Sequence, residues 1–322
     1  MDYTRLGTSG LKVSRIALGC MSFGTGDGAH EWALDDEAAA PVFRAAVEHG
    51  VTFWDTANVY SAGTSEEVTG RAIKEYSRRE DVVLATKVFF RMHDGPGGSG
   101  LSRKAILEQV DASLTRLGTD YVDLYQIHRF DPETPVEETM EALHDVVKAG
   151  KARYIGASSM WAWQLATMQH AAELNGWTPF VSMQDQYSLL QREEEREMFG
   201  LLDHLGVASI PWSPLAKGRL ARPWGGTTQR SETDALQRRY DDESNPPIVG
   251  AVQQVAEARG VPMAQVALAW VLRNPVVAAP IVGPTKVEHL TDAVAAVDLE
   301  LTDDEAAALE APYTPRLPSG FA

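Results

Sequence analysis

A repeated pattern of amphipathic helix, glycine and short apolar strand constrains the fold of this chain most. Five stretches with helical periodicity end in a glycine, namely Gly50, Gly118, Gly150, Gly176 and Gly206, and a strand candidate follows each. Glycine just past a helix supplies the left-handed residue that ends it. Together with three strand candidates outside this pattern, the apolar segments number eight. They are residues 16–19, 51–54, 81–86, 121–127, 152–156, 180–183, 207–210 and 277–282.

Helices that alternate with nearly continuous apolar strands predict a parallel sheet buried on both faces. Eight such units in 322 residues favour a closed (β/α)8 TIM barrel over two doubly wound halves. No linker-like stretch divides the chain, so residues 1–322 are expected to form a single barrel domain. Residues 3–14, with Gly7-Thr8-Ser9-Gly10 at their centre, predict an N-terminal β-hairpin before the first strand.

Local signals mark two of the helices. Thr134-Pro135-Val136-Glu137 reads as a capping box with proline at the first helical position. Thr302-Asp303-Asp304-Glu305 predicts the start of a C-terminal helix. Two polar segments rich in turn formers, residues 91–100 and 224–247, interrupt the pattern after the third and seventh strands. Both leave the carboxyl-terminal face of the predicted barrel, where long loops are binding loops, lids or disordered segments.

The composition excludes several classes of protein. A formal net charge of −16 argues against binding nucleic acid or anionic lipid by charge alone. No run approaches the ~20 apolar residues of a membrane span, and the N-terminus lacks the apolar core of a signal peptide. Cys20 is the only cysteine, which excludes an internal disulfide and favours a reducing, cytoplasmic setting. The histidines show no spacing that suggests a metal site.

Ionisable residues end three consecutive apolar strands. Asp55, Lys87 and His128 stand at the ends of strands two, three and four, and Tyr60 follows Asp55 in a loop. Any one of them alone is more often structural, since an Asp after a strand is a common turn former. Together they would meet at the mouth of the barrel, where the lysine and the aspartate form the natural ion pair.

Their proton chemistry suits a carbonyl reduction. A phenol has a pKa of about 10, and a nearby ammonium lowers it. Asp55 would orient Lys87, Tyr60 would exchange a proton with an alkoxide or alcohol, and neutral His128 would donate a hydrogen bond to the same oxygen. A site that protonates a carbonyl oxygen without offering a nucleophile suits hydride transfer from a bound cofactor.

In this context Asp55, Tyr60, Lys87 and His128 resemble the catalytic tetrad of the aldo-keto reductase superfamily. The resemblance covers nearly the whole chain and includes 10–14, 18–24, 150–158, 212–218 and 281–283. It is closest to the bacterial branch related to potassium-channel β-subunits and YajO-like reductases. The resemblance implies an NADPH-dependent carbonyl reductase without a metal, acting on a small-molecule substrate.

The resemblance also implies cofactor contacts. The nicotinamide would lie near Gly19, Met21 and Asp55, with its carboxamide on Ser158, Ser159 and Gln184. The loop from Trp212 to Gly218 would hold the pyrophosphate, and the segment from Gly283 to Asp292 the adenosine phosphate. The individual positions are Gly19, Met21, Asp55, Ser158, Ser159, Gln184, Trp212, Ser213, Pro214, Leu215, Ala216, Gly218, Arg222, Gly283, Thr285, Lys286, His289 and Asp292.

Three positions depart from the family pattern. Ser159 stands where Asn is common, His289 where Gln is common and Ala293 where Asn is common. Ser159 would reach the carboxamide less well than Asn, and the other two changes affect adenine contacts rather than chemistry. Lys286 and Arg222 are the candidate cations for the 2′-phosphate that distinguishes NADP from NAD, or else ordinary surface charges.

The substrate pocket is expected to be rimmed by Trp32, Phe89, Phe90, Arg129, Phe130 and Trp161, whose aromatic walls suit aromatic or aliphatic aldehydes. Arg129 would favour an anionic group or pair with Asp131. Two other functions stay open. One is a cofactor-binding regulatory subunit with little turnover. The other is a barrel lyase that uses Lys87 as a Schiff-base nucleophile, which borohydride trapping would detect.

Overall fold

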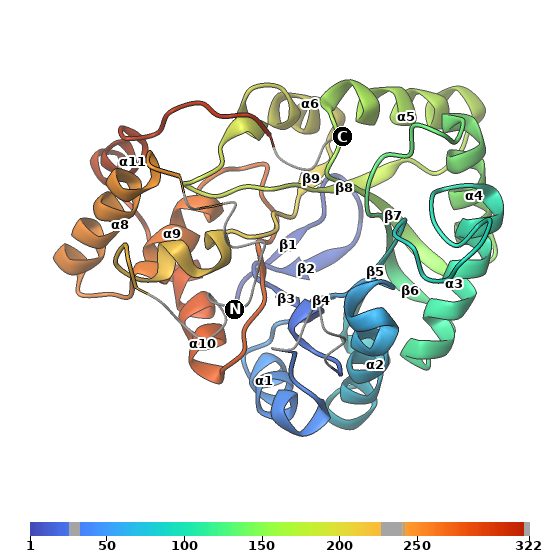
Figure 1. Ribbon diagram of the computed structural model, residues 1–322, viewed down its shortest axis with the longest axis horizontal. Helices are drawn as coiled ribbons and strands as arrows, with labels where there is room; N and C mark the ends of the chain where they lie inside the picture. Colours follow the sequence, from blue (N-terminus) through green and yellow to red (C-terminus); the bar gives the residue numbers. More distant parts are fainter. Residues whose placement is uncertain (26–32, 227–239, 241, 319–322) are drawn as a thin grey trace.

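The computed structural model describes residues 1–25, 33–226, 240 and 242–318, and its centre is an eight-stranded parallel sheet (Figure 1). In spatial order the strands are β10 (Ile281–Val282), β3 (Ala17–Gly19), β4 (Phe53–Asp55), β5 (Val83–Val88), β6 (Val122–Ile127), β7 (Ala152–Ser158), β8 (Phe180–Gln184) and β9 (Ala208–Ser209). Each of the eight segments predicted from the sequence contains or overlaps one of them.

Main-chain hydrogen bonds close the sheet into a barrel. The stretch that leads into β10 runs beside β9, where Ala278 N donates to Ser209 O and Ile281 N donates to Pro211 O, at 2.9 and 2.8 Å. On the other side of this stretch, Ala17 N of β3 donates to Pro280 O at 3.0 Å, so no gap remains between β3 and the segment that leads into β10. The predicted (β/α)8 barrel is therefore confirmed.

Helices surround the strands, as Figure 1 shows. They are α1 (Asp36–Glu48), α2 (Thr64–Tyr76), α3 (Arg103–Leu117), α4 (Val136–Lys148), α5 (Ala162–Asn175), α6 (Met198–Leu205), α8 (Asn245–Arg259), α9 (Met263–Leu272), α10 (Val287–Ala295) and α11 (Asp303–Glu310). All five glycines of the sequence pattern have a positive φ, between 64 and 75°. The C-terminal helix α11 has the predicted capping box between Thr302 and Glu305.

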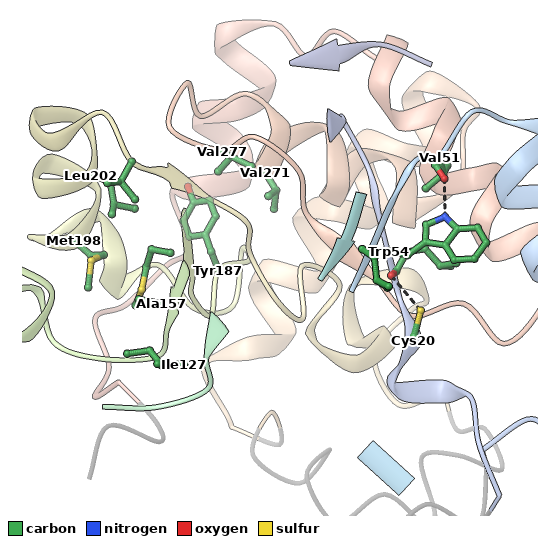
Figure 2. Close-up of a cluster of buried hydrophobic side chains, with 14 of the residues drawn as sticks. Cys20, Val51, Trp54, Ile127, Ala157, Tyr187, Met198, Leu202, Val271 and Val277 are labelled. Atoms are coloured by element: carbon green, nitrogen blue, oxygen red, sulfur yellow. Dashed lines mark hydrogen bonds between the residues drawn. The ribbon is translucent and has the colours of Figure 1, made fainter. Parts of the chain in front are cut away.

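Alternation along each strand separates two apolar layers. Trp54, Leu84 and Tyr125 face outward into the core beneath the helices, part of which Figure 2 shows. Phe53, Ala85 and Leu124 are members of the cluster inside the barrel. Because successive side chains of a strand point to opposite faces, the residues two positions further along, Asp55, Lys87 and Gln126, also point inside.

The predicted hairpin covers the amino-terminal end of the barrel. It consists of β1 (Tyr3–Arg5) and β2 (Lys12–Ser14), which pair antiparallel. Leu6 and Val13 are fully buried and join the interior cluster, while Thr8 N donates to Gly206 O at 2.8 Å. A ligand must therefore enter from the carboxyl-terminal end.

Two details of the sequence prediction are wrong. Thr134 does not cap α4: its hydroxyl donates to Asp131 Oδ2 at 2.8 Å, and Pro135 is the N-cap without a side-chain hydrogen bond. The predicted loop 224–247 is too long, because residues 245–247 form the first turn of α8. Residues 227–239 and 241 of that segment lie outside the described residues. Residues 91–100 contain no helix or strand, as predicted.

Within the described ranges, no helix has the length and apolar character needed to cross a membrane.

Candidate active site

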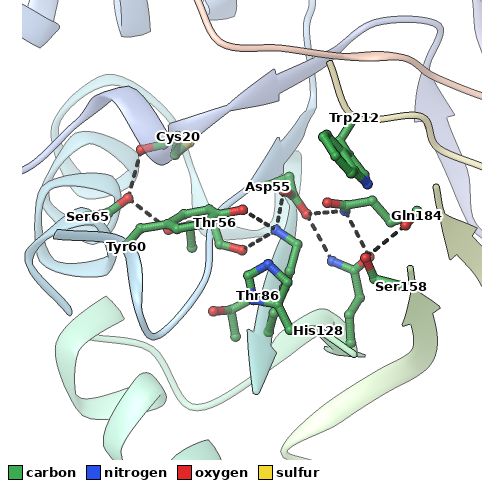
Figure 3. Close-up of polar contacts among 12 residues, drawn as sticks. Cys20, Asp55, Thr56, Tyr60, Ser65, Thr86, His128, Ser158, Gln184 and Trp212 are labelled. Carbon is green, nitrogen blue, oxygen red and sulfur yellow. Dashed lines mark hydrogen bonds and ion pairs between the residues drawn. The ribbon is translucent and has the colours of Figure 1, made fainter. Parts of the chain in front are cut away.

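The candidate site is built at the carboxyl-terminal end of the barrel, where Asp55, Lys87 and Gln126 end the inward-facing rows of three adjacent strands. Figure 3 shows Asp55, Tyr60 and His128 of this site. His128 directly follows β6, and Tyr60 begins the short helix η2 (Tyr60–Gly63) after β4. The structure thus brings together the four residues that the sequence singled out for proton chemistry.

Asp55 is buried, and both of its carboxylate oxygens accept hydrogen bonds. Oδ1 accepts from Lys87 Nζ at 2.5 Å. Oδ2 accepts from two amides, Gln126 Nε2 at 2.9 Å and Gln184 Nε2 at 3.0 Å. Since a buried carboxylate is costly unless paired and hydrogen-bonded, these three donors account for its presence inside the barrel.

Lys87 has no exposed side-chain surface. Besides Asp55, its ammonium donates to Thr56 O at 2.9 Å and to Tyr60 Oη at 3.3 Å. Burial opposes its charge, but Asp55 and then Tyr60 outweigh that effect, so the pKa of Lys87 lies above its ordinary value. Lys87 is therefore a permanent cation whose remaining hydrogen bond reaches the phenol.

Burial raises the pKa of the Tyr60 phenol above 10, and the nearby charge of Lys87 offsets only part of that rise. This corrects the prediction that the ammonium lowers the pKa: the attraction is present, but desolvation of the phenolate is larger. The two residues after Tyr60, Ser61 and Ala62, are both in the left-handed region, with φ of 46 and 52°. Side chains other than glycine rarely adopt this conformation, so the turn after Tyr60 is strained.

His128 is buried, and burial followed by the charges of Lys87 and Arg129 keeps its pKa well below 6.5. Its ring packs edge-on against Tyr60 and Phe90, with centroids 5.7 and 4.8 Å apart. Among the described residues, its Nδ1 has no hydrogen-bond partner. At neutral pH the imidazole is therefore uncharged, as the sequence analysis expected.

A cavity of about 1330 Å³ opens above these residues. Asp55, Tyr60 and His128 line it, and so do most of the positions expected to contact a cofactor. Those positions are Gly19, Met21, Ser158, Gln184, Trp212, Ser213, Pro214, Leu215, Gly218, Arg222, Gly283, Thr285, Lys286, His289 and Asp292. The cavity therefore runs from the barrel mouth over the 212–218 loop to the start of α10.

The comparisons with known proteins place this geometry in a family. Residues 15–313 match the model of the aldo/keto reductase family. The chain belongs to that family. The match spans every strand of the barrel and includes Asp55, Tyr60, Lys87 and His128.

Among relatives, versiconal hemiacetal acetate reductase of Aspergillus parasiticus is 47% identical over 339 residues, covering 98% of each chain. The aldo-keto reductase AMT2 of Alternaria alternata is 44% identical, covering 99% of this chain and 93% of its own. A Schizosaccharomyces pombe protein named as a putative aryl-alcohol dehydrogenase is 43% identical, covering 97% of this chain and 96% of its own. The family match confirms the predicted superfamily. These three relatives are fungal and give no support to the narrower prediction of the bacterial branch.

Several predicted contacts of this aldo/keto reductase lie outside the cavity wall. Ser159 has a φ of 47°, and its hydroxyl accepts from Trp212 Nε1 at 3.1 Å. Ala216, within the 212–218 loop, is fully buried and does not line the cavity. Of the expected substrate residues, Phe90 and Arg129 line the cavity, whereas Phe89, Phe130 and Trp161 do not, and Trp32 lies outside the described residues.

Arg222, Lys286 and His289 gather at the end of the cavity away from Tyr60. Arg222 Nε donates to Gly218 O at 3.0 Å, but Nη1 is buried with no hydrogen-bond partner among the described residues. Burial and then the charge of Arg219 lower the pKa of Arg222. Burial and then the charge of Lys286 lower the pKa of His289. The guanidinium of Arg222, with its unsatisfied Nη1, and the ammonium of Lys286 are therefore suited to an anionic ligand.

The sequence analysis missed Gln126, the one inward-facing residue of β6 between Leu124 and His128. The available signal was a single amide in the otherwise apolar run from Leu124 to Ile127, since a polar group in a strand expected to be buried needs partners. It also missed Gln186 and Tyr240 of the wall, which are joined by a 2.6 Å hydrogen bond. In the part of the chain that the structure describes, no group of three His, Cys, Asp or Glu side chains could hold a metal ion.

Proposed function

We propose that this aldo/keto reductase is an NADPH-dependent oxidoreductase that reduces aldehydes or ketones to alcohols, with Tyr60 as the general acid. The observation that supports this most is the hydrogen bond from buried, cationic Lys87 to Tyr60 Oη, at the floor of a cavity beside neutral His128. The phenol keeps its proton at neutral pH because burial raises its pKa, and it can release the proton only as charge develops on a substrate oxygen.

Each residue has a distinct part in the proposed proton transfer. As Tyr60 donates to the carbonyl oxygen, the nascent phenolate is stabilised by the Lys87 ammonium 3.3 Å away. Asp55 holds that ammonium in place through the 2.5 Å ion pair. Neutral His128 shares the cavity wall with Tyr60 and offers a hydrogen bond to the same oxygen.

The residues of the cavity fit a dinucleotide with a 2′-phosphate. Ser158 and Gln184 would hold its carboxamide, the 212–218 loop its pyrophosphate, and Arg222 and Lys286 its 2′-phosphate. The unpartnered Nη1 of Arg222 supports the last assignment, since a buried guanidinium donor without an acceptor is costly. When bound, the cofactor supplies the hydride that the protein's own side chains lack.

The proposed substrate class is aldehydes with an aromatic or apolar body. Phe90 faces the cavity next to His128, and Arg129 beside it would favour an anionic substituent. The names of two relatives, one a hemiacetal acetate reductase and one an aryl-alcohol dehydrogenase, concern carbonyl-level or benzylic carbons and agree with this class.

Turnover tests the proposal. Purified protein mixed with NADPH and 4-nitrobenzaldehyde should oxidise the cofactor, measured as loss of nicotinamide absorbance, and form the benzyl alcohol. Tight NADPH binding without turnover across a panel of aldehydes would favour the regulatory subunit instead. An adduct on Lys87 after borohydride treatment would favour the Schiff-base lyase.

We also infer that residues 1–322 form a single domain, as the continuous barrel suggests. A reducing, cytoplasmic setting remains part of the proposal and rests on the single cysteine, Cys20, which is buried.

A further inference from the structure

Gln126 lies between the two parts of the candidate site, the proton-transfer residues and the cofactor contacts. Its side chain is fully buried inside the barrel. Its amide nitrogen donates to Asp55 Oδ2 at 2.9 Å, and its amide oxygen accepts from Gln184 Nε2 at 3.1 Å. Gln184 Nε2 donates in addition to Asp55 Oδ2 at 3.0 Å. Figure 3 shows Gln184 beside Asp55.

The chemistry of the carboxylate fixes the direction of this chain of amides. Asp55, paired with the Lys87 ammonium, can only accept hydrogen bonds. Gln126 must therefore turn its nitrogen to Asp55 and its oxygen to Gln184. Gln184 must in turn use its nitrogen for these two acceptors. The oxygen of Gln184 is then the end of its amide left for a molecule in the cavity that Gln184 lines.

The barrel is shaped around Gln126. Gly156 is its register partner on β7, and a Cβ at Gly156 would lie 3.1 Å from Gln126 Cγ and 2.5 Å from Ser182 Oγ. The backbone of Gly156 is not in the left-handed region, so space, rather than conformation, calls for glycine there. The absence of a side chain on β7 leaves the room that the Gln126 stem occupies.

We propose that Gln126 is a positioning residue that sets the orientation of the Gln184 amide, so that Gln184 presents an acceptor to the carboxamide NH₂ of the nicotinamide. The proposal rests on the proposed function, because it assumes that a nicotinamide occupies the cavity. It ties cofactor recognition to Asp55: the carboxylate that holds Lys87 also dictates, directly and through Gln126, which atom of Gln184 faces the cofactor.

The test compares two probes that differ in the nicotinamide half. Gln126→Met keeps the length of the side chain and removes both amide hydrogen bonds. We expect it to weaken binding of NADP⁺ about tenfold, the effect of one or two lost hydrogen bonds. Binding of adenosine 2′,5′-bisphosphate, which lacks nicotinamide, should stay unchanged. Both dissociation constants come from titration calorimetry. The control is Tyr125→Phe, which changes a buried hydroxyl on the outer face of the same strand and should alter neither constant.

A second variant tests the direction of the amide chain. In Gln126→Glu a protonated carboxyl can still donate to Asp55 and accept from Gln184, whereas the ionised form places a second negative charge beside Asp55. Relative to wild type, NADP⁺ affinity should therefore be near normal at about pH 5 and fall toward about pH 8. A loss that does not vary with pH would contradict the fixed orientation.

The outcomes separate the two proposals. Equal affinity of Gln126→Met and wild type for NADP⁺, or an equal loss for both probes, would overturn the role of Gln126 and leave the proposed function standing. Failure of the wild-type protein to bind NADP⁺ would overturn both, because the assumed occupant of the cavity would be wrong.

Discussion

Tyr60 experiences two opposing influences, and their balance decides its chemistry. Desolvation favours the neutral phenol, and Lys87 favours the phenolate. With the first effect larger, the pKa stays above 10, so Tyr60 carries its proton throughout the neutral range. The residue is thereby suited to give a proton to a substrate oxygen, while the ammonium 3.3 Å away limits the cost of the charge left behind.

Replacing Tyr60 by Phe should separate chemistry from binding. The ring and its edge-on contact with His128 remain, but the proton donor is lost. We expect kcat for 4-nitrobenzaldehyde to fall by a factor on the order of 10² to 10⁴, while the NADPH dissociation constant changes less than twofold. Steady-state rates and calorimetry measure the two quantities. Turnover within a few-fold of wild type would exclude Tyr60 as the acid.

Lys87→Met should abolish turnover and also destabilise the protein, because it leaves the Asp55 carboxylate buried without its ammonium. The expected loss in the free energy of unfolding is about 3–5 kcal/mol, measured by urea denaturation. The double variant Asp55→Asn/Lys87→Met should recover much of this loss without regaining activity. If the double variant is as unstable as the sum of the single variants, the two side chains are not energetically coupled.

At the scale of elements, a pair of buried acids connects the end of β8 with the short helix η4 (Glu193–Glu195). Asp185 follows Gln184 directly, accepts a 2.7 Å hydrogen bond from Ser209 at Oδ1, and has no partner for Oδ2 among the described residues. Burial raises the pKa of Asp185 to about 7. Burial and then the charge of Asp185 raise that of Glu194 to about 9.

This pair predicts a pH-dependent stability. Between the ordinary carboxyl pKa of about 4 and these raised values, the folded protein binds more protons than the unfolded chain. The free energy of unfolding should therefore fall as pH rises from about 4 to about 7 on account of Asp185, and on to about 9 on account of Glu194. Asp185→Asn should flatten the decline and stabilise the protein at about pH 8 by roughly 2 kcal/mol. Asp203→Asn, at an exposed acid of α6, is the control. Parallel curves for all three proteins would contradict the assignment.

Which features could be predicted from sequence depends on the range of the interactions that create them. The strands and the glycine ends of the helices follow from local periodicity and backbone conformation, and both were predicted. Thr134 was misread because Asp131, three residues earlier, competes for its hydroxyl. The net pKa direction of Tyr60 and the role of Gln126 depend on burial and on partners from distant strands, which no local pattern reveals.

For the whole molecule, a net charge of −16 contrasts with the cations at one end of the cavity. A dinucleotide phosphate is itself strongly anionic, so its binding depends on that local reversal of potential. Lys286→Ala and Arg222→Ala should each weaken NADPH binding about tenfold or more, with little effect on NADH. Equal affinities of the wild type for the two cofactors would remove the 2′-phosphate assignment.

Raising the salt concentration should weaken NADPH binding more than NADH binding.

The closed barrel predicts cooperative unfolding. If residues 1–322 are one domain, calorimetry should show a single unfolding transition, and saturating NADPH should raise the midpoint temperature of that transition. A ligand that binds only the folded state stabilises it by about 2.7 kcal/mol at a hundredfold excess over the dissociation constant. Two transitions, of which NADPH shifts only one, would indicate separate units instead.

The close approach of Gly156 to Gln126 restricts how this protein can evolve. A mutation that adds a side chain at Gly156 places its Cβ 3.1 Å from Gln126 Cγ and 2.5 Å from Ser182 Oγ, so both neighbouring side chains must shift or become smaller to admit it. A shorter residue at position 126 would in turn release the amide of Gln184. Changes at positions 126, 156, 182 and 184 are therefore expected to be concerted, and intermediates that change Gly156 alone should be the ones that selection removes.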